Sequence, residues 1–112
     1  MTIFEKIAAR EIPAQIVYEA EDFVAFRDAN PQAPVHVLIV PRHCIARIAE
    51  AGAEDAGLLG RMLLASPEIA RTAGVAESGF RLVINNGRDA GESVPHLHIH
   101  LLGGRALQWP PG

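Results

Sequence analysis

The sequence has a single cysteine, no long apolar run and no strong excess of charge of either sign. Because Cys44 is alone, a disulfide within the chain is excluded, and a reducing compartment is indicated. The apolar runs are far shorter than the ~20 residues that a membrane span requires, and no basic segment followed by an apolar run opens the chain. We therefore expect a cytoplasmic protein that does not associate with membranes.

The charge pattern also argues against binding to nucleic acid. The formal net charge is −3, and the basic residues are scattered rather than gathered into a stripe. A small phosphorylated ligand stays open as a partner, since it needs only a few aimed donors. No repeat, low-complexity tract or linker divides the 112 residues, so we expect one domain over residues 1–112.

The pattern of apolar residues predicts an α+β domain with an antiparallel sheet of about five strands. Proline should end the first helix at about Arg10, and Pro67 should kink or split the long one. The predicted helices are Ile3–Arg10, with Ile3, Phe4 and Ile7 on one side, and Asp55–Ala73, with an apolar stripe of Leu58, Leu59, Met62 and Leu63. The predicted strands are Gln15–Tyr18 and Phe23–Phe26, which form a hairpin, Val35–Val40 at the centre, and Phe80–Ile84 and His96–Leu102.

Three of the five histidines alternate with apolar residues in the segment HLHIHLL. Successive side chains of a strand point to opposite faces, so His96, His98 and His100 are predicted to share one face. Leu97 and Ile99 then face the core, and the imidazoles form a row that faces away from it. We expect this row to be the functional site.

Three interpretations of the row differ in chemistry. A solvated strand face would carry other polar residues among the histidines, and it carries none. A metal site is limited by distance, since same-face neighbours lie about 6.6 Å apart and the outer pair about 13 Å apart, too far for all three rings to reach one ion. His36 or His43 could complete a two-histidine metal site, but no carboxylate stands beside the row.

The third interpretation makes one histidine a nucleophile. An imidazole with an ordinary pKa near 6.5 is mostly neutral at cytoplasmic pH, so it attacks without a separate base. The other ring nitrogen must then carry the proton, and a backbone carbonyl or a second imidazole can hold that tautomer. His98 is the natural choice, because a histidine stands on each side of it.

Two further regions are candidates for the same site. The segment NNGRDAGESVP, residues 85–95, supplies two glycines and the polar side chains of Asn85, Asn86 and Ser93, as a loop that holds a phosphate would. It is equally an ordinary connection between strands. His36, in VHVLIV, is either a core histidine or a partner of the row, and Asp28 is either a turn residue or an acceptor for the two hydroxyls of a ribose.

The chain resembles the histidine triad superfamily, whose signature is three histidines separated by apolar residues, as in HLHIHLL. The similarity to the Hint branch, the histidine triad nucleotide-binding proteins, extends through IFEKIAAREIPA, FRDANPQAPVHVLIVPRH, GFRLVINNG, GESVPHLHIHLLGGR and the ending WPPG. It covers residues 3 to 112.

The resemblance implies a histidine-triad fold in a homodimer whose two sheets join across the interface. It implies hydrolysis of purine nucleoside phosphoramidates through a nucleotidyl-histidine, with no cofactor and with a purine nucleoside monophosphate as product. His98 would be the nucleophile, and His36, His96 and His100 would orient it and relay protons. Asp28 would bind the ribose and Ala29 would line the base pocket. The other positions carried over are Asn85, Gly91 and Ser93 for the phosphate and leaving group, and Trp109, near the partner subunit's site.

Two departures and two rival functions accompany this resemblance. Pro67 interrupts a helix that is usually continuous, and Ala29 replaces a larger aliphatic residue, so weaker purine binding is expected. One rival is a purine nucleotide-binding or protein-interaction module with incidental turnover. The other is hydrolysis of dinucleoside polyphosphates, the work of the Fhit branch, whose members usually have Gln at the position of Pro95 and lack WPPG.

Overall fold

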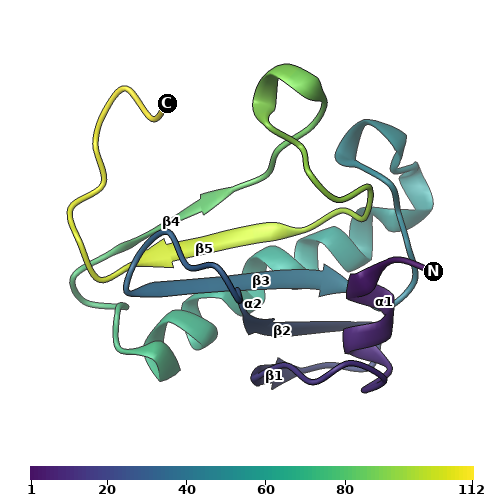
Figure 1. Ribbon diagram of the computed structural model, residues 1–112, viewed down its shortest axis with the longest axis horizontal. Coiled ribbons are helices and arrows are strands. Elements are labelled where there is room, and N and C mark those ends of the chain that lie inside the picture. Colours follow the sequence, from purple (N-terminus) through teal and green to yellow (C-terminus); the bar gives the residue numbers. More distant parts are fainter.

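Five antiparallel strands form one sheet in the order β1-β2-β3-β5-β4 in the computed structural model, which describes all 112 residues (Figure 1). The predicted α+β architecture is confirmed. The strands are β1 (Ile16–Glu19), β2 (Phe23–Arg27), β3 (Val35–Pro41), β4 (Phe80–Val83) and β5 (Ile99–Gly103). The α-helices are α1 (Ile3–Ala8) and α2 (Ala56–Ala73), and short 3-10 turns span Ile48–Glu50, Ala53–Asp55 and Arg88–Ala90.

Strand β3 lies at the centre of the sheet, between β2 and β5, and all its residues are buried. Val37 and Ile39 point into the core beneath α2, whereas Leu38 and Val40 pack on the opposite face with residues of α1. Both faces of β3 are therefore covered, and this explains why its sequence is nearly continuous in β-branched residues instead of alternating with polar ones.

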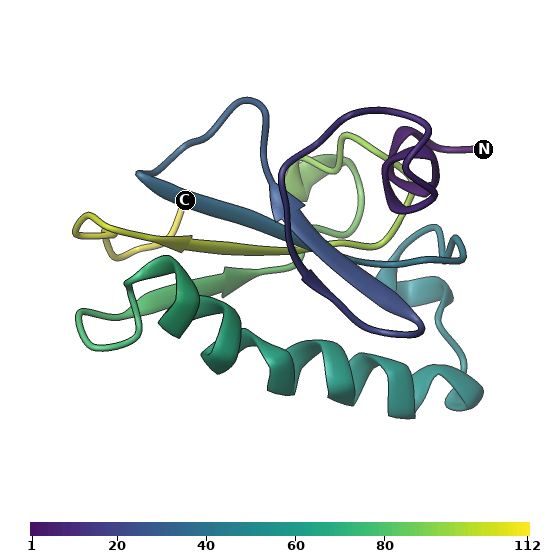
Figure 2. The same cartoon turned by 90° about the horizontal axis from the view of Figure 1, so that it is seen from below.

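Helix α2 runs along one face of the sheet (Figure 2). It buries Leu58, Met62 and Ile69 against β3 and β5. The predicted stripe is wrong at one position, because Leu63 is 41% exposed. Leu63 points outward together with Leu64, so these two leucines form an apolar outer face of the helix.

Pro67 was predicted to kink or split α2, and it does not split it, since a single helix spans Ala56–Ala73. A proline has no N–H to donate to the carbonyl four residues earlier, which here belongs to Leu63. The hydroxyl of Ser66 donates to that carbonyl instead, at 2.6 Å. The acceptor that Pro67 would leave unpaired is thereby satisfied.

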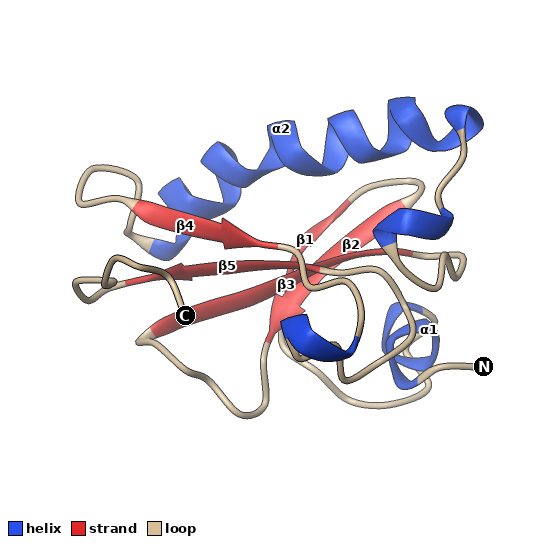
Figure 3. Ribbon diagram, turned by 90° about the horizontal axis from the view of Figure 1, so that it is seen from above, coloured by secondary structure: helices blue, strands red, loops and turns tan.

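Helix α1 lies on the other face of the sheet, opposite α2 (Figure 3). Thr2 and Glu5 form a capping box at its start. The helix ends at Ala8 rather than Arg10, because Arg10 adopts a left-handed backbone conformation with φ of 61°. Phe4 and Ile7 are buried as predicted, but Ile3 is 50% exposed and does not share their side. None of the helices combines the length and apolar character that a bilayer crossing requires.

Candidate active site

The alternation in HLHIHLL separates the side chains as predicted, but the strand begins later than predicted. β5 starts at Ile99. His96 lies in a bend before the strand, and the N–H of His96 donates to the carbonyl of Val94 at 2.8 Å. Leu97, Ile99 and Leu101 join the core under α2, while the histidines lie on the other face. That face is not solvated, because His96 is 0% and His98 6% exposed.

His98 is held in one tautomer by a backbone contact. Its Nδ1 lies 2.7 Å from the carbonyl oxygen of His96, and a carbonyl only accepts, so Nδ1 carries the proton. The ring of Phe4 packs edge-on against it, with 5.0 Å between the ring centres. Nε2 therefore keeps its lone pair; it has no partner within the chain and is not among the fully buried polar atoms.

His36 and His100 are joined in a directed chain of hydrogen bonds. The backbone N–H of Gln32 donates to Nδ1 of His36 at 3.0 Å, so the proton of a neutral His36 is on Nε2. That Nε2 lies 2.9 Å from Nδ1 of His100 and 3.4 Å from Oδ2 of Asp28. The proton of His100 is then on its own Nε2, which is the one buried side-chain polar atom without a partner.

The protein environment keeps these imidazoles neutral. Burial lowers the pKa of His36, against the opposing effect of the Asp28 carboxylate. Burial, followed by the proximity of His98 and His36, lowers the pKa of His100 to about 4. Near neutral pH, His100 therefore presents an uncharged N–H donor that nothing in the chain accepts.

Both ring nitrogens of His96 are already hydrogen-bonded. Nε2 donates to the carbonyl of Pro41 at 2.8 Å, and Nδ1 accepts from the hydroxyl of Thr2 at 2.6 Å. Burial lowers the pKa of this ring as well. His96 therefore has no free nitrogen for a proton relay, and its contact with His98 is through its backbone carbonyl.

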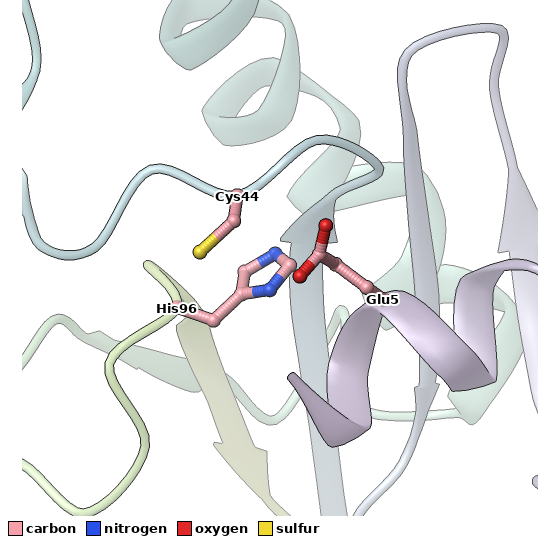
Figure 4. A group of neighbouring side chains, drawn as sticks. All are labelled: Glu5, Cys44 and His96. Carbon is pink, nitrogen blue, oxygen red and sulfur yellow. The ribbon is translucent and has the colours of Figure 1, made fainter. Parts of the chain in front are cut away.

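Two groups of side chains could offer ligand atoms to a metal ion. Glu5 and Cys44 lie beside His96, as Figure 4 shows, and the three ligand atoms are within 4.8 Å of one another. Asp28, His36 and His100 form the second group, and their ligand atoms also lie within 4.8 Å of one another. An ion at either group would have to displace the hydrogen bonds described above.

A cleft of about 490 Å³ adjoins the histidines, within the size range of small-molecule sites. α1, residues 12–15 and the end of β2 enclose it. Phe4, Phe26 and Leu38 make its walls apolar, and Asp28 and Ala29 stand at the end of β2. Asp28 thus belongs to both the cleft and the histidine chain. No histidine lines this cleft or the larger one of about 670 Å³ between α2 and the β1–β2 hairpin, but Asp28 and Phe4 of the first cleft contact His36 and His98.

The segment 85–95 lies immediately before the histidines. Asn85 is half-buried, and Gly91 and Ser93 are exposed, with Gly91 at a φ of 82° that favours glycine. No hydrogen bond joins these three residues to a histidine side chain. Trp109 is 81% exposed and makes no aromatic pair with any of the histidine rings.

Sequence reasoning missed three residues that set the histidines. Thr2, the N-cap of α1, contacts His96, and Phe4 of α1 packs against His96 and His98. The backbone of Gln32 sets the tautomer of His36. The capping-box pattern of Thr2 and Glu5 was visible in the sequence and could have located the start of α1. The Gln32 contact is made by the backbone, so no residue type signals it.

Comparison with known proteins identifies close relatives. A family model of the HIT domain matches residues 9–107. An uncharacterized HIT-like protein of Synechocystis sp. is 54% identical over 111 residues, which are 99% of this chain and 96% of that protein. Purine nucleoside phosphoramidase of Escherichia coli K12 is 49% identical over 106 residues, 95% of this chain and 89% of that protein.

Solved structures agree with these matches. A HIT family hydrolase from Legionella pneumophila superposes with a TM-score of 0.96 at 46% identity, and each chain is covered in full. A histidine triad protein from Clostridium difficile gives a TM-score of 0.91 at 38% identity, covering 95% of this chain and 92% of that one.

Proposed function

Because the chain belongs to the HIT domain family, we propose that it hydrolyses purine nucleoside phosphoramidates through a covalent nucleotidyl-histidine. One observation carries this proposal: Nδ1 of His98 donates to the carbonyl of His96 at 2.7 Å, which leaves Nε2 as a free lone pair. The phosphoramidase among the relatives, 49% identical, supports the choice of substrate.

The first step replaces a P–N bond by a bond to His98. Nε2 attacks the phosphorus, the bond from phosphorus to the amine breaks, and the amine nitrogen takes up one proton as it leaves. Nδ1 keeps its proton on the carbonyl of His96, so positive charge that develops on the ring is stabilised by that oxygen. In the second step water attacks the phosphorus, the bond to Nε2 breaks, and one proton is released. Overall, phosphoramidate and water give a nucleotide and an amine.

His100 is suited to bind the phosphate during both steps. Its Nε2–H is buried and unpartnered, and a donor in that state is costly unless a ligand oxygen accepts from it. We propose that this N–H donates a hydrogen bond to a phosphate oxygen, where the negative charge increases as the five-coordinate state forms. His36 orients His100, and His96 orients His98 through its carbonyl.

The apolar cleft is suited to the purine, and Asp28 to the ribose. Phe4, Phe26 and Leu38 offer apolar surface for a flat ring, and Ala29 at the end of β2 leaves that surface incomplete. Oδ1 of Asp28 accepts from the N–H of Asn30 at 2.8 Å, so the carboxylate is held in place with lone pairs left for the hydroxyls.

The remaining expected contacts come from the loop and from a second subunit. Asn85, Gly91 and Ser93 precede the histidines and would bind the phosphate and the leaving group. A homodimer is supported by β4, which is an edge strand of the sheet, and by Ile84, which follows it and is 37% exposed. Trp109 would then lie near the partner subunit's site. Light scattering in solution tests the dimer.

A fluorogenic adenosine phosphoramidate tests the activity. The wild type should release the amine, and His98→Ala should lose at least about a thousandfold in kcat, whereas the exposed His43→Ala serves as a matched control and should keep it. Mass spectrometry of a quenched reaction should find the nucleotidyl adduct on His98. Equal turnover by the wild type and His98→Ala would end the proposal.

Two outcomes would favour the rival functions. A nucleotide-binding module would bind adenosine monophosphate but turn over no phosphoramidate at a measurable rate. A dinucleoside polyphosphate hydrolase would cleave diadenosine polyphosphates faster than any phosphoramidate. No contact in the structure favours either of them over the phosphoramidase.

A further inference from the structure

The loop that precedes the histidines is closed by one carboxylate. The N–H of Gly87 donates to Oε1 of Glu92 at 3.0 Å, and the N–H of Glu92 donates to the carbonyl of Gly87 at 3.1 Å. These two bonds form a ring that encloses residues 88–91. Gly91 and Ser93, the neighbours of Glu92 in sequence, are two of the three loop residues assigned above to the phosphate and leaving group.

Arg47 ties this ring to the body of the protein. Its Nε lies 3.0 Å from Oε1 of Glu92, and its Nη2 lies 3.1 Å from Oε2, a two-bond pairing that fixes the direction of the carboxylate. Two more bonds join the same segments: the N–H of Ala49 donates to Oδ1 of Asn86 at 2.9 Å, and the N–H of Leu97 donates to the carbonyl of Ile45 at 2.6 Å. The segment 45–49 therefore holds the loop on both sides of Glu92.

Glu92 places a carboxylate next to the residues assigned to the phosphate. Its side chain is only 12% exposed, and a negative charge there opposes a phosphate bound by its neighbours. Hydrogen bonds from Arg47 and from Gly87, with a smaller effect of His98, lower the pKa of Glu92, so the carboxylate is charged at neutral pH. The guanidinium of Arg47 offsets this charge through Nε and Nη2, while its Nη1 pairs with the exposed carboxylate of Glu50.

We propose that Arg47 and Glu92 are positioning residues that form a clamp on the phosphate-binding loop, in which the guanidinium offsets the negative charge of Glu92 beside the nucleotide. This inference rests on the proposed function. It predicts that substitutions of Arg47 and of Glu92 affect KM differently. Loss of Arg47 leaves the anion of Glu92 unpaired beside the phosphate, whereas loss of the charge of Glu92 leaves Arg47 paired with Glu50 alone.

Three variants separate the clamp from a merely structural ion pair: Arg47→Gln, Glu92→Gln and the double variant. Arg47→Gln should raise KM by about three- to tenfold, with a smaller change in kcat. Glu92→Gln should not raise KM, and its effect should fall on kcat. The double variant should return KM to within about twofold of the wild type, because no unpaired carboxylate remains in the loop and the carboxylate of Glu50 is exposed to solvent. Arg71→Gln, which breaks an exposed pair with Glu68 on α2, is the matched control and should change neither constant.

Two further measurements do not depend on turnover. Calorimetric titration with adenosine monophosphate should give the same order of affinities. Hydrogen exchange of the Gly87 and Glu92 amides should be faster in Arg47→Gln than in the wild type.

The possible failures are distinguishable. A wild type that hydrolyses no phosphoramidate overturns the proposed function, and the titrations and exchange rates still test the clamp. An active wild type with a double variant whose KM shows the sum of both single defects, or with a KM of Arg47→Gln equal to that of the wild type, overturns the clamp alone. Unchanged exchange of Gly87 in Arg47→Gln overturns it as well.

Discussion

Lowering the pH from 7 to 5 is expected to destabilise the folded protein through His100 by about 2 kcal/mol. Burial, together with the nearby His98 and His36, lowers the pKa of His100 from its ordinary value of 6.5 to about 4 in the folded chain. The unfolded chain has no such environment, so its imidazole binds a proton near the ordinary pKa. Acid therefore favours the unfolded state.

The sign and the pH range follow from the two pKa values. Well above pH 6.5 neither state holds the proton, and the stability is at its full value. Between pH 6.5 and about 4 the unfolded state binds a proton that the folded state does not, so the free energy of unfolding falls as the pH falls. At pH 5 the proton-binding factor, 1 + 10^(pKa − pH), is about thirtyfold larger for the unfolded state than for the folded state. This ratio corresponds to the loss of about 2 kcal/mol. Below pH 4 this contribution levels off.

Urea denaturation at both pH values measures this loss, at one fixed protein concentration because a dimer would make the midpoint depend on it. The quantity compared is the change in the free energy of unfolding between pH 7 and pH 5, in the wild type and in His100→Gln. The amide of the Gln can still pair with His36. His96 also has a lowered pKa, but it shares no hydrogen bond with His100, so its effect is the same in both proteins and cancels in the difference.

The same slope of stability against pH in the wild type and His100→Gln would refute this reasoning. It would mean that His100 is protonated in the folded state at pH 5. His100 would then offer a positive charge to the phosphate and not a neutral donor, and the role assigned to its unpartnered Nε2 would have to be changed.

Three other substitutions test separate contacts. Ser66→Ala should lower the free energy of unfolding by about 1 kcal/mol, measured with urea, because the carbonyl of Leu63 loses its donor beside the proline; an unchanged midpoint would contradict this. Thr2→Val should cost about 1–2 kcal/mol, seen as a lower thermal midpoint, since it removes both the helix cap and the donor to His96. Ala29→Ile should lower KM for an adenosine phosphoramidate about threefold at constant kcat, by extending the apolar cleft; a higher KM would show that the base binds elsewhere.

The sequence predicted well those elements whose burial follows from the local pattern of apolar residues. Val35–Val40 was recognised as a central strand because its β-branched run is apolar on both faces, and β3 is buried throughout. The start of the last strand was predicted three residues early, since alternation continues through His96 although the backbone there bends. The break expected at Pro67 is absent because the neighbouring Ser66 hydroxyl replaces the missing donor, a contact that helix propensity does not describe.

The sequence by itself determined that three imidazoles share one face of the sheet, because the side chains of an extended backbone alternate whatever surrounds them. Only the tertiary structure decided what each imidazole can do. The contacts that set the tautomers of His96, His36 and His100 come from Pro41, Gln32 and His36, each on a segment that folding brings alongside its ring. The proton on a histidine ring is located by the donor or acceptor that meets either of its nitrogens, and for each of these rings that group lies in the backbone or is distant in sequence.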